Sequence, residues 1–213
     1  MTTTRTILIA AAAALLSWTV ASAEPAPAPP AATLPAGQYT LDPAHASLVF
    51  HVNHLGVSNF TSRFSKFDAT LDIDPAHPET ARVTATIDPA SVEIFGSNLA
   101  SILKSDKWFN VARFPQMTFK STKVERTGDK TARITGELTL HGITRPVVLD
   151  ATFNGGYGKN SFDPGGARIG FSARGTLNRS QFGLAEGIPS PGTTMGVGDA
   201  VQFQLEVEFS RKD

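Results

Sequence analysis

Apolar and polar residues alternate with a period of two along most of this chain. In the segment 201–209 every odd position is apolar and nearly every even position is polar. This alternation is typical of β-strands that bury one face and expose the other. It recurs at 48–52, 67–73, 83–87, 134–140, 147–153 and 169–177, and more weakly at 116–125. The pattern therefore predicts about eight strands and an all-β fold.

Turn-forming residues separate the predicted strands, and one segment departs from the strand pattern. The clearest turn signals are Asp74-Pro75, Thr127-Gly128-Asp129 and Gly155-Gly156. Asn98 is a candidate cap for a short helix in which Leu99, Ile102 and Leu103 share one face. Eight antiparallel strands with one apolar face each can form a sandwich or a closed barrel. Periodicity alone does not distinguish the two.

Small residues occupy the middle of most predicted apolar faces. An eight-stranded barrel is just wide enough to be filled by side chains or to hold one ligand, so small central residues favour a cavity. The alternative is that they face large residues from other strands. The small residues are Ala69, Ala85, Gly136, Ala151, Ala173 and Gly175.

Composition narrows the ligand class. The chain has 14 Phe against two Tyr and two Trp, which gives an interior suited to hydrocarbon. Burying about ten methylenes contributes ~8 kcal/mol against association costs of ~4 kcal/mol or more, so long chains should bind better than short ones. The formal net charge of +0 argues against nucleic acid as a partner. The absence of cysteine excludes disulfides and thiolate metal sites.

The first residues predict an export signal. Arg5 precedes an apolar run over 7–20, and Ala21-Ser22-Ala23 has the small-x-small pattern of a cleavage site. The run is too short for a permanent anchor of about 20 residues. We therefore expect a signal peptide at 1–23, cleaved after Ala23, a Pro/Ala-rich linker at 24–37 and a barrel domain at 38–213.

The sequence carries no recognisable catalytic or metal-binding motif, so we predict no catalytic residue, no metal site and no cofactor. His51 and His54 are three apart on a strand and point to opposite faces. His54 continues the inner row of its strand, where it would contact a ligand's polar head or simply end the strand. Arg179 follows a predicted strand, and it would either pair with an anionic head group or cap loop carbonyls.

An ordered set of segments resembles the YceI-like proteins. The resemblance is carried by 45–58, Phe64, Phe67, 91–93, 103–106, 114–122, 134–147 and 177–183, which together span almost everything from Tyr39 to Phe209. It implies an eight-stranded antiparallel, lipocalin-like barrel in the periplasm, often dimeric, that binds a polyisoprenoid or a related long-chain amphiphile. Where many relatives carry an Arg-Asp pair and a His, this chain has Leu99, Ala100 and Ile102. This departure suggests a less polar lipid.

We therefore expect a non-enzymatic periplasmic protein that transports or stores a long apolar lipid in a barrel cavity, with transient membrane contact and homodimer formation as further expectations. The alternatives are an accessory protein or enzyme of isoprenoid or quinone metabolism, and a filled barrel that acts as a stress-response interaction module. His54 and Arg179 are the candidate head-group contacts. The candidate cavity-lining residues are Phe50, Val52, His54, Phe67, Leu71, Phe119, Leu138, Leu140, Phe171 and Phe203.

Overall fold

The computed structural model describes residues 34–94 and 99–211. The described part of the chain contains strands, short 3-10 helical turns and one α-helix, α1 (Leu99–Lys104). The strands are β1 (Gly37–Leu41), β2 (Ser47–His54), β3 (Ser58–Phe64), β4 (Phe67–Ile73), β5 (Arg82–Ile87), β6 (Val92–Glu93), β7 (Met117–Arg126), β8 (Thr131–Leu140), β9 (Ile143–Tyr157), β10 (Ala167–Asn178) and β11 (Val197–Arg211). The 3-10 turns are η2 (Pro43–His45), η3 (Pro78–Thr80), η4 (Pro89–Ser91) and η5 (Arg179–Phe182).

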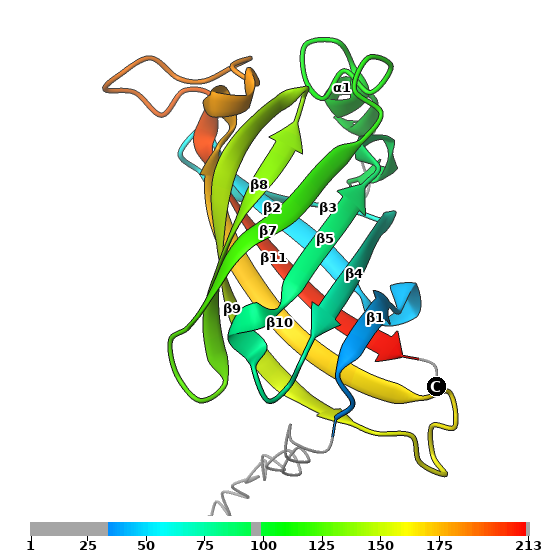
Figure 1. The fold of residues 1–213 in the computed structure, drawn as a ribbon. Helices are drawn as coiled ribbons and strands as arrows, with labels where there is room; N and C mark the ends of the chain where they lie inside the picture. The colour runs from blue at the N-terminus through cyan, green and yellow to red at the C-terminus, as the bar shows by residue number, and fades with distance from the viewer. Residues whose placement is uncertain (1–33, 95–98, 212–213) are drawn as a thin grey trace, which may run out of the picture.

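The strands form a closed antiparallel barrel (Figure 1). Strands β1, β4, β5, β7, β8, β9, β10 and β11 follow one another around the ring, and the pairing of β1 with β11 closes it. Strands β2, β3 and β6 extend the sheet beyond β11. They continue β1, β4 and β5 past a break in each, so the architecture is an eight-stranded barrel. The predicted all-β, lipocalin-like barrel with a short helix in a connection is confirmed, and a sandwich is excluded.

A repeated Asp-Pro-Ala sequence makes two of these breaks. At η2, Asp42 Oδ1 accepts a hydrogen bond from Ala44 N at 3.0 Å, and at η4, Asp88 Oδ1 accepts one from Ala90 N at 2.8 Å. The intervening proline fixes φ and has no N–H for the strand ladder. The chain therefore turns out of one strand and resumes as the next.

The N-terminal boundary differs from the sequence expectation. Leu34 lies within the expected linker 24–37, yet it is 6% exposed and packs in a core cluster with Tyr39 and Ile169. Strand β1 begins at Gly37. The expected signal peptide at 1–23 and the candidate helix cap Asn98 lie outside the described residues. Over the described ranges, none of the helices has the length and apolar character needed to cross a bilayer.

Two groups of buried side chains divide the barrel interior along its axis. We call the end that carries α1 and the 183–196 loop the upper end, and the end that carries the β7–β8 hairpin and the β4–β5 connection the lower end (Figure 1). The upper group includes Phe50, Phe64 and Leu140, and the lower group includes Leu71 and Phe209. Phe50, Leu140, Leu71 and Phe209 stand on inner faces that the period-two pattern predicts, whereas Phe64 stands on β3, which that pattern does not predict.

Candidate functional site

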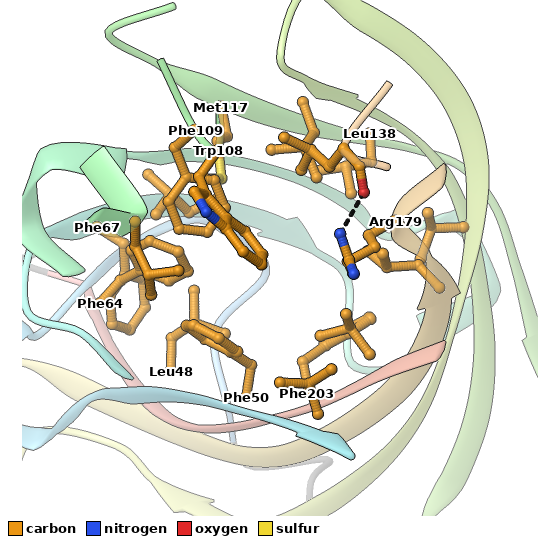
Figure 2. Close-up of a pocket in the computed structure, with 18 of the residues that line it drawn as sticks. Leu48, Phe50, Phe64, Phe67, Trp108, Phe109, Met117, Leu138, Arg179 and Phe203 are labelled. Carbon is orange, nitrogen blue, oxygen red and sulfur yellow. Dashed lines mark hydrogen bonds between the residues drawn. The ribbon is translucent and has the colours of Figure 1, made fainter. Parts of the chain in front are cut away.

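The barrel is hollow, and its interior contains two cavities. The upper cavity has a volume of about 350 Å³ and the lower cavity about 320 Å³. Figure 2 shows the upper cavity, where Phe50, Phe64 and Trp108 stand around an open centre. An engineered apolar cavity of ~150 Å³ stays dry and binds benzene, so either cavity is large enough for an organic ligand.

The wall of the upper cavity is almost entirely apolar. Its aromatic side chains come from several strands and from the connection after α1. At the rim, Leu99 and Ile102 of α1 line the cavity while remaining 41% and 49% exposed. Exposed apolar side chains that continue into a cavity are the expected features of an entrance for a hydrocarbon. The aromatic lining residues are Phe50, Phe60, Phe64, Phe67, Trp108, Phe109, Phe119 and Phe203.

The lower cavity combines an apolar wall with a polar mouth. Leu71, Phe171 and Phe209 line its depth. Its mouth lies between the β4–β5 connection and the β7–β8 hairpin. The hairpin supplies the polar border, which consists of Arg126, Gly128, Asp129, Lys130 and Thr131.

The two cavities meet at a shared ring of side chains, which we call the waist. Five side chains border both of them, one each from β4, β5, β7, β9 and β11. Ala85 is the smallest of the five, and it pairs across the sheet with Phe119. The waist residues are Phe67, Ala85, Phe119, Leu149 and Leu205.

Two glycines allow aromatic rings to lie against the barrel wall. A β-carbon built at Gly136 would overlap the Phe119 ring, and one built at Gly175 would lie 2.5 Å from Cζ of Phe203. The space beside each glycine is therefore not empty, because an aromatic ring fills it. The two glycines keep the lumen open indirectly, since the rings would otherwise project further toward the axis.

The predicted cavity-lining residues all border one of the two cavities. Eight of them border the upper cavity: Phe50, Val52, His54, Phe67, Phe119, Leu138, Leu140 and Phe203. Leu71 and Phe171 border the lower cavity, which Phe67 and Phe119 share. Their contact with a ligand stays a prediction. The sequence-based set omitted Phe60, which lies on a strand without clean alternation, and the polar border of the lower cavity, which lies at the β7–β8 hairpin.

Arg179 faces the upper cavity, but its guanidinium is already bonded to backbone. Nε donates to Gly198 O at 2.9 Å, Nη1 to Leu184 O at 2.5 Å and Nη2 to Val197 O at 2.8 Å. The side chain is 4% exposed, and burial lowers the pKa of Arg179 below its ordinary value. The guanidinium also lies 5.1 Å from the centroid of the Trp108 ring. Of the two roles considered from sequence, the geometry shows the capping of loop carbonyls.

His54 lies at the end of β2, opposite Val197 of β11, on the rim of the upper cavity. The residue is exposed. His54 thus continues the inner row of β2 to the end of the strand, as the alternation predicts. Its contact with a polar head group stays a prediction.

An ion-pair network lies outside the cavities, where η2 meets β10 and β11. Arg168 Nη1 lies 2.5 Å from Asp42 Oδ2 and 3.1 Å from Glu208 Oε2, and Arg168 Nε lies 2.6 Å from Asp163 Oδ2. Hydrogen bonds from Arg168 and His45 lower the pKa of Asp42 to about 2. Asp42, His45 and Glu208 have the spacing of a metal site. The guanidinium already supplies the positive charge between their carboxylates, so the arrangement does not suit a cation.

A family profile described as the YceI-like domain matches residues 39–209. The chain belongs to the YceI-like family. A UPF0312 protein from Pseudomonas savastanoi pv. phaseolicola is 39% identical to this YceI-like chain over 161 residues, which cover 75% of the chain and 80% of the relative. The similarity thus includes most of the described barrel.

Solved structures share the barrel of this YceI-like chain. The YCEI protein of Campylobacter jejuni is 32% identical, has a TM-score of 0.65, and the match covers 76% of this chain and 90% of that one. BcnA of Burkholderia cenocepacia is 25% identical, with a TM-score of 0.66 and coverage of 79% and 98%. A polyisoprenoid binding domain from Saccharophagus degradans, 14% identical with a TM-score of 0.58 over 81% of this chain and 97% of that one, shares the fold.

Proposed function

We propose that this protein is an exported binding protein that holds a long apolar lipid in the barrel, for transport or storage in the periplasm. The observation that carries the proposal is the upper cavity, whose described lining contains only two titratable side chains, His54 and Arg179. Arg179 is committed to three carbonyls. The remaining wall is hydrocarbon, aromatic ring or thioether.

Such a wall favours a hydrocarbon ligand over water or a polar metabolite. A buried water needs two to four polar partners, and this wall offers almost none. A ligand that fills the space restores the dispersion contacts that the lining atoms lack when they face a void. A sugar or nucleotide would lose its hydrogen bonds to water without replacement.

A polyisoprenoid is the proposed lipid class. The support is the family membership together with a structural neighbour described as a polyisoprenoid binding domain. The rim residues Leu99 and Ile102 border the cavity with carbon. We therefore propose a lipid with a weakly polar head, such as a prenyl alcohol or quinone.

Organic extraction followed by mass spectrometry tests the proposal. Protein purified without detergent should release a long-chain apolar lipid at close to one equivalent. Leu138→Asn places an amide on the inner face and should reduce the recovered lipid severalfold. Glu137→Gln, which changes the adjacent exposed position, should retain it. A folded wild-type protein that yields no lipid and takes none up, or that yields only strongly anionic lipid, would contradict the proposal.

A further inference from the structure

The waist between the two cavities determines whether one ligand can use both. Ala85 and Phe119 lie opposite each other across the β5–β7 pair, and both border the upper and the lower cavity. Ala85 contributes only a methyl group at this point. Any larger side chain there would occupy space in the constriction that Phe67, Leu149 and Leu205 complete.

The Phe119 ring lies over Gly136, which leaves the ring room beside the barrel wall. A β-carbon at Gly136 would overlap the ring and would also come within 2.7 Å of Lys120 O. The ring therefore needs glycine at this position to lie where it does. Gly136 is thus a positioning residue for Phe119. Phe119 and Ala85 together determine the width of the waist.

The two cavity volumes determine how long a ligand must be before it occupies both cavities. If ~150 Å³ holds the six carbons of benzene, each cavity holds roughly 13 carbons and the two together hold roughly 27. A chain of three isoprene units, about 15 carbons, is about the most that one cavity can hold. A chain of five or six units needs both.

We propose that a single chain of about 25–30 carbons passes through the waist and fills both cavities, so that Ala85, Phe119 and Gly136 set the chain length that the protein selects. This inference rests on the proposed function. It predicts a ligand much longer than the upper cavity alone would hold, because each additional buried methylene raises affinity by about fourfold.

Native mass spectrometry and calorimetric titration with two linear prenyl alcohols, one of 15 carbons and one of about 30, test the inference on delipidated full chain. The wild type should bind one copy of the long alcohol and up to two copies of the short one, with the long alcohol at least tenfold tighter. Ala85→Phe blocks the waist and should weaken the long alcohol at least tenfold while changing the short one less than threefold. Thr86→Phe is the control, because it adds the same ring to the outer face of β5.

Circular dichroism and the midpoint of urea-induced unfolding establish that each variant is folded. If Ala85→Phe does not fold, Ala85→Leu narrows the same point with fewer atoms and should show the same selectivity at smaller magnitude. Equal binding of the two alcohols by wild type, or equal effects of the Ala85 variants on both, would overturn the inference while leaving lipid binding intact. Failure of the wild type to bind either alcohol would overturn the proposed function together with the inference.

Discussion

Arg179 is the residue whose role the structure changes most. Its three hydrogen bonds reach Leu184 near the start of the 183–196 loop and Val197 and Gly198, the first two residues of β11. One side chain therefore fastens both ends of this loop beside the upper cavity. From sequence alone, head-group binding and carbonyl capping were both open, because the position of a side chain relative to distant carbonyls is not a local property.

Replacing Arg179 with Lys should destabilise the protein by about 2–4 kcal/mol, because an ammonium cannot reach three diverging carbonyls and would leave buried acceptors without donors. Urea unfolding measures this loss. Limited proteolysis should also cut the 183–196 loop faster in the variant. A variant of unchanged stability with weakened lipid binding would instead support the head-group role.

Asp42 provides a test of the ion-pair network. Its folded-state pKa of about 2 lies below the ordinary value of 3.8, so the carboxylate stabilises the fold above pH 4 and loses this contribution as pH falls toward 2. Asp42→Asn keeps a side-chain acceptor for the η2 cap and removes the charge. We expect a loss of about 1–2 kcal/mol at pH 7, since the pair with Arg168 is partly solvent-screened.

The pH dependence identifies the cause. The stability difference between wild type and Asp42→Asn, measured by urea unfolding at pH 7, 5 and 3, should be constant above pH 5 and smaller at pH 3. A difference that stays constant to pH 3 would show that packing rather than charge is responsible.

At the scale of elements, the sequence predicted the strands with strict alternation and missed those without it. The segments that correspond to β2, β4, β5 and β7–β11 alternate, and all were predicted. In β3, Ser62 is buried on the inner face beside Phe64, so the apolar row is interrupted. Strand β6 has only two residues. These two strands are defined by their pairing with neighbouring strands in the sheet, which the sequence alone does not show.

The small-residue pattern predicted a hollow barrel for a reason that is only partly right. Ala85 does leave space at the waist. Gly136 and Gly175 instead accommodate the rings of Phe119 and Phe203. A sequence lists such glycines and rings without showing which ring covers which glycine, because the contact depends on strand register.

The segment before β1 is an element whose packing can be tested. Leu34 contacts the region of Gly156, where a β-carbon would lie 2.9 Å from Leu34 Cδ1. Leu34→Ala should lower the free energy of unfolding by about 2 kcal/mol or more. Gln38→Ala, at an exposed position of β1, should have little effect. Equal free energies of unfolding for wild type and Leu34→Ala would mean that Leu34 does not stabilise the core and is part of the linker.

Helix α1 is the element at which ligand entry can be tested. Ile102 borders the upper cavity and is half-exposed, so Ile102→Glu should preserve folding but slow lipid uptake severalfold by placing charge in the entrance. Stopped-flow transfer of a fluorescent lipid measures the rate. Lys107→Gln changes the net charge equally at an exposed position and is the control. Equal uptake rates in both variants would place the entrance elsewhere.

At the scale of the whole molecule, the same inner faces supply the hydrophobic core and the cavity walls. The paired strands and the ion-pair network around Arg168 hold the ring closed, while the inner faces leave about 350 Å³ and about 320 Å³ that the protein's own side chains do not fill. Protein interiors are ordinarily packed with few voids larger than a water molecule. Two apolar cavities of this size are costly unless a ligand occupies them, and this argues for a bound lipid as the protein's usual state.

A crystal structure of the protein purified without detergent tests this account most directly. We predict continuous electron density for a single chain that runs from the α1 rim past Ala85 and Phe119 into the lower cavity. A barrel whose axis is closed by Phe119, Phe203 and their neighbours, with no density for a ligand, would contradict it.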